Sequence, residues 1–179
     1  MAKKRKHIES TSQLALGGNV LIQVKEGKRT LKTLNVHNLA TINLFMGIAE
    51  ALSNIKGNIE QNLPRYLGAG TGILEQGQDE VLLTGLITPI QMVMSLVERI
   101  NSPRIIDKKG VVTFQSVLPY PSIGSTTIIK ELGLYGNSNI NSNTMVARVQ
   151  IPEEGIQLSK GQSLYVQWTF AVENKQLGE

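Results

Sequence analysis

The sequence predicts an all-β fold, a jelly-roll-like β-sandwich with one short α-helix, and its C-terminal third carries most of that prediction. From Gln162 to Val172, apolar and polar residues alternate strictly, which is typical of a strand with one buried face. The apolar face holds Leu164, Val166, Trp168, Phe170 and Val172. Residues 126–135 and 144–150 have the composition of two further strands. A strand as long as 162–172 needs a partner on each edge and a second layer over Trp168, so we expect it in the middle of a sheet.

A β-hairpin is predicted near the N-terminus. Residues 20–25 alternate apolar and polar side chains, and residues 30–36 return as a second strand. The connection Glu26-Gly27-Lys28 contains a glycine, which adopts the positive φ of a tight turn at little cost. Two such runs joined by a short glycine turn favour a hairpin.

The one predicted helix follows this hairpin. Thr41 is placed to cap its N-terminus through the hydroxyl, and the helix is expected to end by Ser53 or Asn54. Apolar residues recur along it at steps of three and four, and we expect this stripe to close one end of the sandwich. The stripe consists of Ile42, Phe45, Met46, Ala49 and Leu52.

The middle of the chain predicts three more strands. Residues 64–68 form a short one, and a long one is expected from Ile90 to about Asn101. Residues 111–118 are expected to pair with the long strand through a turn at residues 108–110.

Composition indicates one domain with an arm. The chain has 179 residues, of which 41% are hydrophobic, so a core can form. We divide it into a flexible basic arm, residues 1–12, and a single domain, residues 13–179. Only 18% of residues are charged, below the roughly 25% of an average soluble domain. Two explanations stay open: neutral loops in a β-rich protein, or a surface buried against neighbours, where charges are depleted.

The positive charge is concentrated in the arm. The net charge is +4, and the arm's four consecutive basic residues account for all of it. These residues are Lys3, Lys4, Arg5 and Lys6. The run is either a solvated terminus or an electrostatic tether to phosphates or to an acidic protein surface. Nucleic acid is not expected as the main ligand, because the domain has no strand face of interleaved basic and aromatic residues.

Several classes of site have little support. The chain has no cysteine, which excludes a thiolate metal site. It has only two histidines, His7 and His37, which are far apart in sequence, so a histidine-based catalytic triad is not favoured. No apolar run reaches the roughly 18 residues of a membrane span, and the basic N-terminus lacks the apolar core of a secretory signal. We therefore expect no catalytic residues, cofactor, metal or membrane contact, and a soluble protein kept inside a cell or in a particle assembled there.

The segment Gly68-Ala69-Gly70-Thr71-Gly72 is the one glycine-rich candidate for phosphate binding. The dinucleotide-binding motif requires a helix directly after the glycines, and no helical stripe follows them here. The P-loop requires a Lys-Ser or Lys-Thr pair, which is also missing. We interpret it as a structural turn or interface loop.

A buried ion pair is the one side-chain pair that we single out. Glu131 interrupts an otherwise apolar strand, where a carboxylate is costly unless it has a partner. Arg148, in the neighbouring strand of the same hairpin, is the candidate partner. The alternative is that both side chains point into solvent. His37 is interpreted as a capping or packing residue, and no spacing selects an acid pair among Glu98, Asp107, Glu153 and Glu154.

The order of these segments resembles a family of small structural proteins of tailed bacteriophages. The resemblance covers residues 30–172 and is carried by five motifs in a fixed order. The motifs are Asn38 with Gly47, Tyr66-Leu67-Gly68-Ala69-Gly70-Thr71-Gly72, Ile129-Lys130-Glu131-Leu132-Gly133-Leu134-Tyr135, Met145-Val146-Ala147-Arg148, and Leu164-Tyr165-Val166-Gln167-Trp168-Thr169-Phe170. The arm has no counterpart in the family pattern, and residues 88–106 fit it loosely.

The resemblance implies a non-enzymatic virion protein that assembles symmetrically, as a homo-oligomer, in the tail, neck or baseplate region. Its partners would be other phage virion proteins, which would contact the sheet edges and the loops at residues 68–80 and 136–143, while the basic arm would bind a neighbouring protein. Its location would be the virion, assembled in the host bacterial cytoplasm. One alternative is a capsid decoration or head-fibre protein anchored by the basic arm. A second is a carbohydrate-binding fibre module, which requires an exposed aromatic platform.

Overall fold

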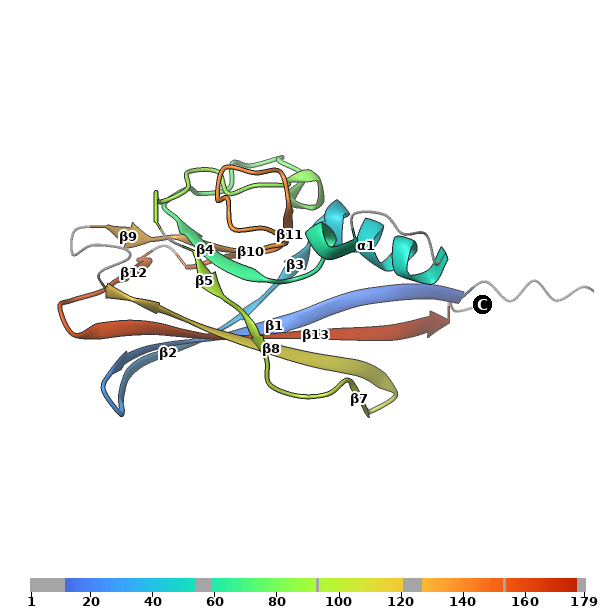
Figure 1. Cartoon of the computed structure of the whole chain (residues 1–179), viewed down its shortest axis with the longest axis horizontal. Helices are drawn as coiled ribbons and strands as arrows, with labels where there is room; N and C mark the ends of the chain where they lie inside the picture. The colour runs from blue at the N-terminus through green and yellow to red at the C-terminus, as the bar shows by residue number, and fades with distance from the viewer. Residues whose placement is uncertain (1–11, 54–58, 93, 121–126, 153, 177–179) are drawn as a thin grey trace, which may run out of the picture.

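The structure is a computed structural model, which describes residues 12–53, 59–92, 94–120, 127–152 and 154–176. Within these residues two main antiparallel sheets face each other, with one α-helix, α1 (Ile42–Ser53), beside them (Figure 1). The predicted all-β sandwich with one short helix is confirmed. The described residues also form two 3₁₀ helices, η1 (Ile59–Asn62) and η2 (Glu80–Leu82).

Sheet A has the order β2-β1-β13-β8-β6, and β7 also pairs with β8. Its strands are β1 (Ser12–Glu26), β2 (Arg29–His37), β6 (Glu98–Arg99), β7 (Arg104–Ile106), β8 (Lys109–Pro119) and β13 (Gln162–Gln176). Sheet B has the order β3-β11-β10-β4-β5. Its strands are β3 (Leu39–Ala40), β4 (Tyr66–Gly70), β5 (Ser95–Leu96), β10 (Glu131–Tyr135) and β11 (Met145–Gln150). A small third sheet pairs β9 (Ile128–Ile129) with β12 (Ile156–Gln157).

The C-terminal strand lies in the middle of its sheet, as predicted. β13 pairs with β1 on one edge and with β8 on the other, so Trp168 stands between Val20 and Phe114. Trp168 is 1% exposed, which confirms the buried face. The alternating pattern of residues 162–172 therefore identified the strand face that lies in the core of the sandwich. The strand itself continues to Gln176.

The N-terminal hairpin is confirmed and is longer than predicted. β1 and β2 pair from Asn19 opposite His37 to Glu26 opposite Arg29, and Gly27 makes the turn with φ +56°. β1 begins at Ser12, so the last residue of the predicted arm starts a strand. Residues 1–11 lie outside the described residues.

The prediction of one long strand over residues 90–101 is wrong. That stretch contains only β5 and β6, two residues each, and they belong to different sheets. The Val97 amide donates to the Arg65 carbonyl on the sheet B side (2.9 Å), and the Ile100 amide donates to the Thr113 carbonyl on the sheet A side (3.0 Å). The segment crosses from sheet B to sheet A, so its backbone cannot hydrogen-bond to one partner strand along its whole length. β8 instead makes its tight turn with β7, through residues 107 and 108 at positive φ.

One buried core joins the two sheets. It takes Val20, Ile22 and Val24 from β1, and it includes residues of β13, β10, β11 and β4. The strands of sheet A are the longer ones: β1 and β13 have 15 residues each, whereas β4 and β10 have 5 each. Figure 1 shows sheet A extending beyond sheet B at the end where α1 lies.

The central strands of sheet B are buried on both faces. Every residue of β10 is buried, including Glu131 and Tyr135, and so are five of the six residues of β11. The face turned away from sheet A carries a second apolar cluster, with contributions from the loops that follow β4 and β10. Its buried members are Leu86, Met94, Tyr135, Ile140 and Met145. These loops thus form a third layer over sheet B.

The helix has the predicted bounds but the opposite orientation. Its buried residues are Leu44 and Gly47, whereas the predicted apolar stripe is exposed. The cause lies at Gly47: a Cβ there would stand 2.7 Å from the Asn62 carbonyl oxygen, so only glycine lets η1 pack this closely. Thr41 precedes the helix, but its hydroxyl donates to the Met145 carbonyl (2.5 Å), which ties the helix start to β11. Among the described residues, no helix has the length and hydropathy needed to span a membrane.

Candidate functional site

The structure brings Glu131 and Arg148 together under the loop layer that covers sheet B. They are diagonal neighbours on β10 and β11, since Gly133 is opposite Arg148 and Gln150 is opposite Glu131. Arg148 donates to Glu131 Oε2 from Nε (3.1 Å) and from Nη2 (3.0 Å). Both residues are 0% exposed, so the pair lies inside the protein rather than in solvent.

Glu131 also accepts hydrogen bonds from the covering loop. The amides of Gly72 (3.2 Å) and Thr88 (2.9 Å) donate to its Oε1, and the Ile87 amide donates to its Oε2 (3.2 Å). Five donors therefore satisfy one buried carboxylate. Because three of them are loop amides, the carboxylate fixes both ends of the loop, residues 72 and 87–88, to the sheet.

Gln150 extends this network. Its Oε1 accepts from Arg148 Nη2 (2.7 Å), and its Nε2 donates to the carbonyls of Lys130 (2.7 Å) and Gly72 (3.2 Å). Arg148 Nη1 lies 4.0 Å from the Glu80 carboxylate and has no hydrogen-bond partner among the described residues. The cluster of Glu131, Arg148 and Gln150 is thus committed to internal bonds, and its position under the loop suits a structural role.

The glycine-rich segment is not a turn. Residues 68–70 lie inside β4, and Gly70 is opposite Glu131. A Cβ at Gly70 or at Gly72 would collide with the Glu131 side chain. These glycines therefore make room for the buried carboxylate, and residues 68–70 cannot meet a partner as the loop interpretation expected.

Tyr135 forms a second tie between sheet B and the covering loop. Its hydroxyl accepts a hydrogen bond from the Leu86 amide (3.0 Å) in the buried region. Burial disfavours the charged phenolate and raises the pKa of Tyr135 from 10.0 to about 12. The side chain therefore stays neutral well above neutral pH.

We expect Tyr135→Phe to lower the free energy of unfolding at pH 7 by about 1–3 kcal/mol, because the buried Leu86 amide loses its acceptor. The pKa of Tyr135 is raised in the folded state, so its contribution to stability is complete below pH 10 and is lost as the pH rises from 10 through about 12. Urea unfolding of both proteins across this range checks the prediction. A Tyr135→Phe protein with the same pH dependence as the parent would contradict it.

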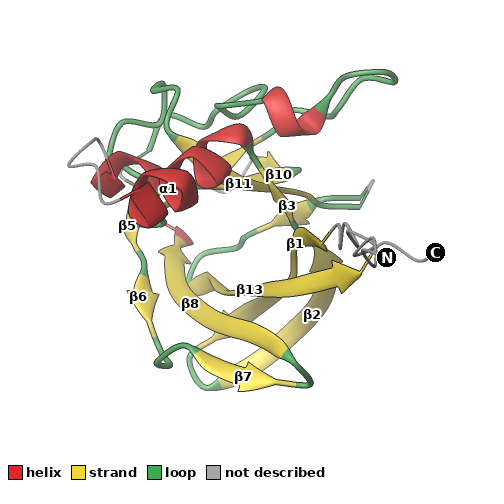
Figure 2. Cartoon of the chain, turned by 90° about the vertical axis from the view of Figure 1, so that its right-hand side faces the viewer, coloured by secondary structure: helices red, strands yellow, loops and turns green. Residues whose placement is uncertain are grey.

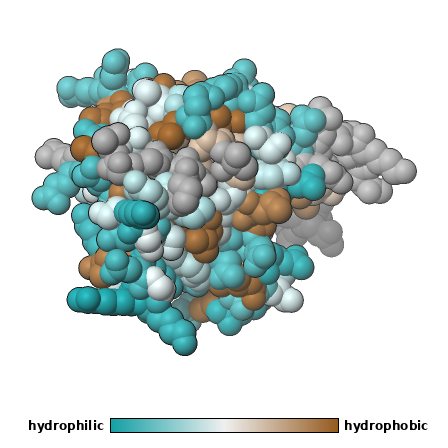
Figure 3. Space-filling model, turned by 60° about the vertical axis from the view of Figure 1, so that its left-hand side comes forward, coloured by the Kyte–Doolittle hydropathy of each residue, from teal (hydrophilic) through white to brown (hydrophobic). Residues whose placement is uncertain are grey.

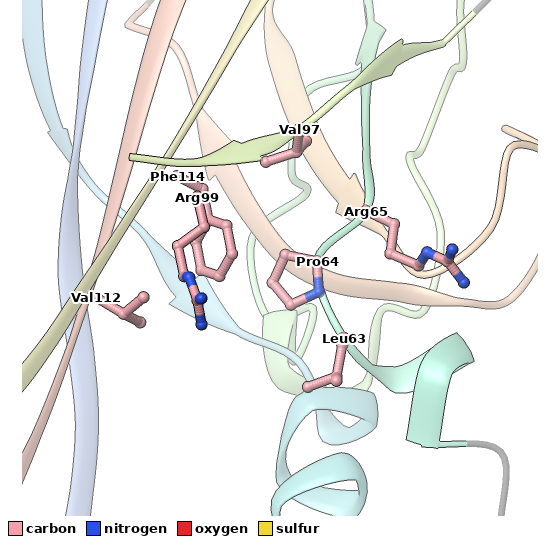
Figure 4. A pocket seen from close by; sticks show the side chains of 7 residues that line it. All are labelled: Leu63, Pro64, Arg65, Val97, Arg99, Val112 and Phe114. Carbon is pink, nitrogen blue, oxygen red and sulfur yellow. The ribbon is translucent and has the colours of Figure 1, made fainter. Parts of the chain in front are cut away.

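A groove with a cavity volume of about 600 Å³ lies between β8 and the segment that leads into β4. Its lining residues are Leu63, Pro64, Arg65, Val97, Arg99, Val112 and Phe114. Figure 4 shows the Arg99 side chain beside Phe114, with Leu63 and Pro64 across from them and the Arg65 guanidinium pointing away. The groove opens where residues 97–100 leave sheet B for sheet A. Its lining combines apolar side chains with two arginines, and it contains no acid or imidazole for acid–base chemistry.

Apolar side chains are also exposed elsewhere. Figure 3 shows hydrophobic residues scattered among hydrophilic ones on one face of the molecule. Single exposed hydrophobics are ordinary on a soluble protein, whereas a group on one element indicates an interaction surface. The predicted helix stripe is such a group: Leu52 is 78% exposed and Met46 51%. Figure 2 shows α1 on the outside of the molecule.

The remaining predicted residues do not assemble into a site. His37 ends β2 with an exposed side chain, so the packing interpretation is wrong. Glu98, Asp107 and Glu154 are exposed and come from separate parts of the chain. Lys3, Lys4, Arg5, Lys6 and Glu153 lie outside the described residues. In the part of the chain that is described, no three His, Asp or Glu residues group as a metal site would require.

No protein-family model, curated protein or solved structure matches this chain.

Proposed function

We propose that this protein is a non-enzymatic structural component of a tailed bacteriophage, in the tail, neck or baseplate region, that works by attaching to other virion proteins. The proposal combines the resemblance of its ordered motifs with one observation on the surface. That observation is the apolar face that α1 turns outward, where Phe45 is 40% exposed, Met46 51% and Leu52 78%.

The distribution of polar residues supports attachment over chemistry. Glu131 and Arg148 carry the buried charge of the described residues, and their hydrogen bonds hold a loop to a sheet. Exposed apolar groups on a helix are costly in water and gain free energy when a partner covers them. A particle repeats each contact many times, so an interface of modest area is sufficient to hold a component in place.

The two alternatives make different demands on the chain. A capsid decoration protein would depend on the arm with Lys3, Lys4, Arg5 and Lys6, which the described residues do not include. A carbohydrate-binding module needs an exposed aromatic platform, and the single tryptophan, Trp168, is 1% exposed. The tail, neck or baseplate assignment therefore remains the preferred one.

The test is the location of the chain in cells that produce the phage particles. We expect it to co-purify with intact particles through a density gradient at a constant ratio to the major structural proteins. Particles that form normally while this chain stays in the soluble fraction would contradict the proposal. Deleting residues 1–8 separates the alternatives: the decoration role predicts loss of particle association, and the preferred role predicts that the helix surface retains it.

A further inference from the structure

The outer face of α1 has the spacing of a helix–helix seam. We define this face by Ile42, Phe45, Met46, Ala49 and Leu52. Residues 42, 45, 49 and 52 follow steps of three, four and three, which is the pattern by which one helix packs along another. The opposite side, with Leu44 and Gly47, is already buried within this chain.

We propose that a second copy of this chain covers the outer face of α1, with the two helices packed antiparallel about a twofold axis. This inference rests on the proposed function, because it names the partner of the same surface. A twofold contact requires a surface that complements itself. The outer face of α1 meets this requirement because all five of its residues are uncharged.

The charge of α1 distinguishes a second copy of the chain from a membrane surface as the partner of its outer face. Glu50 is the only charged residue of α1, and it lies off the outer face, where it accepts a hydrogen bond from Asn62 Nδ2 (3.1 Å). Two copies would therefore meet without like-charge repulsion. A helix that binds a membrane surface carries Lys or Arg on its polar side, and α1 has neither. The neutral face favours a protein helix of the same kind.

The shape and area of the face fit a reversible dimer. Ala49 lies at the middle of the seam, where a small side chain lets two helices approach to about 8–10 Å. With about 200 Å² for a fully exposed large side chain, the exposed parts of Ile42, Phe45, Met46 and Leu52 amount to about 400 Å² per copy. Pairing would bury about 800 Å² from these side chains alone, which is below the roughly 1,200 Å² of stable specific interfaces and corresponds to a weak, transient contact. We therefore expect dissociation in the micromolar range.

Sedimentation equilibrium of the full chain over a range of about 1–200 µM tests the proposal. We expect the mass to rise from one chain to two across this range. Met46→Glu and Leu52→Glu place a charge in the seam and should each weaken dimerisation at least ~100-fold. Leu82→Glu is the matched control: Leu82 is 63% exposed but lies on η2, and this variant should dimerise as the parent does.

Circular dichroism melting establishes that each variant is folded; because both helix positions are exposed, folding should survive the change. The proposal is overturned if the parent stays monomeric at 200 µM, if it dimerises and the helix variants dimerise equally, or if Leu82→Glu also abolishes the dimer. Binding of the monomeric parent to lipid vesicles through the same face would overturn it as well. A monomer in solution that still co-purifies with particles would refute this inference and leave the proposed function standing.

Discussion

Replacing Glu131 by glutamine is expected to lower the free energy of unfolding by about 3–5 kcal/mol, since it removes the hydrogen-bonded counter-charge of a buried guanidinium and leaves only the partly exposed Glu80 carboxylate, 4.0 Å away. Arg148 is 0% exposed, and Gln150 is its other hydrogen-bond acceptor among the described residues. The glutamine amide also presents hydrogens to loop amides that now donate to the carboxylate. This is one of the two largest effects that we expect from a single substitution.

Arg148→Met should cost less, about 2–3 kcal/mol, because the carboxylate that remains keeps three amide donors from the loop. The double variant should be more stable than the sum of the two losses predicts, by about 2 kcal/mol, because each single change leaves the other partner uncompensated. Urea unfolding of the four proteins gives this coupling free energy.

An exposed ion pair provides the control. Lys109 and Glu173 approach to 2.7 Å, but their side chains are 45% and 28% exposed. Lys109→Met should therefore cost about 1 kcal/mol or less. Additive effects at Glu131 and Arg148, or losses no larger than that of Lys109→Met, would show that the buried pair does not hold the loop layer to sheet B.

Gly18→Ala is expected to destabilise the protein by about 3 kcal/mol or more, through overpacking that the backbone cannot relieve. An added Cβ would overlap the Thr169 carbonyl oxygen of β13 and would lie 2.6 Å from Asn38 Oδ1. Moving β1 away would break its pairing with β13 in the centre of sheet A. Thermal and urea unfolding measure the loss.

The neighbouring residue is a matched control for this substitution. At Gly17 an added Cβ meets nothing within 4 Å, so Gly17→Ala in the same strand should change the free energy of unfolding by about 0.5 kcal/mol or less. Equal effects at Gly17 and Gly18 would mean that strand propensity, rather than close packing of β1 on β13, sets the cost.

The sequence allowed the core of sheet A to be predicted because alternation at period two has one simple structural meaning. Trp168 and its neighbours on β13 are buried where that pattern placed them. The contact between Glu131 and Arg148 could be anticipated for a similar reason: a charge in an apolar strand needs a partner, and the adjacent strand of the hairpin supplied one.

The glycines in and just after β4 show why the site was only partly predictable. Gly68, Gly70 and Gly72 recur at every second residue, which is the signal of one strand face that another group approaches closely. Reading the segment as a turn missed this signal. At Gly70 and Gly72 the group that approaches is Glu131, about sixty residues away in sequence, and at Gly68 it is Ile140. Local composition does not identify such distant neighbours.

The orientation of α1 could not be predicted from its apolar stripe. A stripe normally faces the core, but here Gly47 lets η1 pack on the other side of the helix and leaves Phe45 and Met46 outside. The available signal was a glycine within the helix, beside Leu44 and Ile48, which are four residues apart and so share one helix face. The prediction of one long strand over residues 90–101 was wrong for a different reason. The chain changes from one sheet to the other there, so no single face of the segment stays buried along its length.

Site-specific photo-crosslinking tests most directly whether this protein functions by attachment through α1. A photoreactive residue at position 46 should join the chain to another protein in assembled particles, and to a second copy in concentrated solution. The same residue at position 82 should give at most a minor fraction of those products. If position 46 yields no protein crosslink in particles or in solution, the outer face of α1 is not an attachment surface and the account is contradicted.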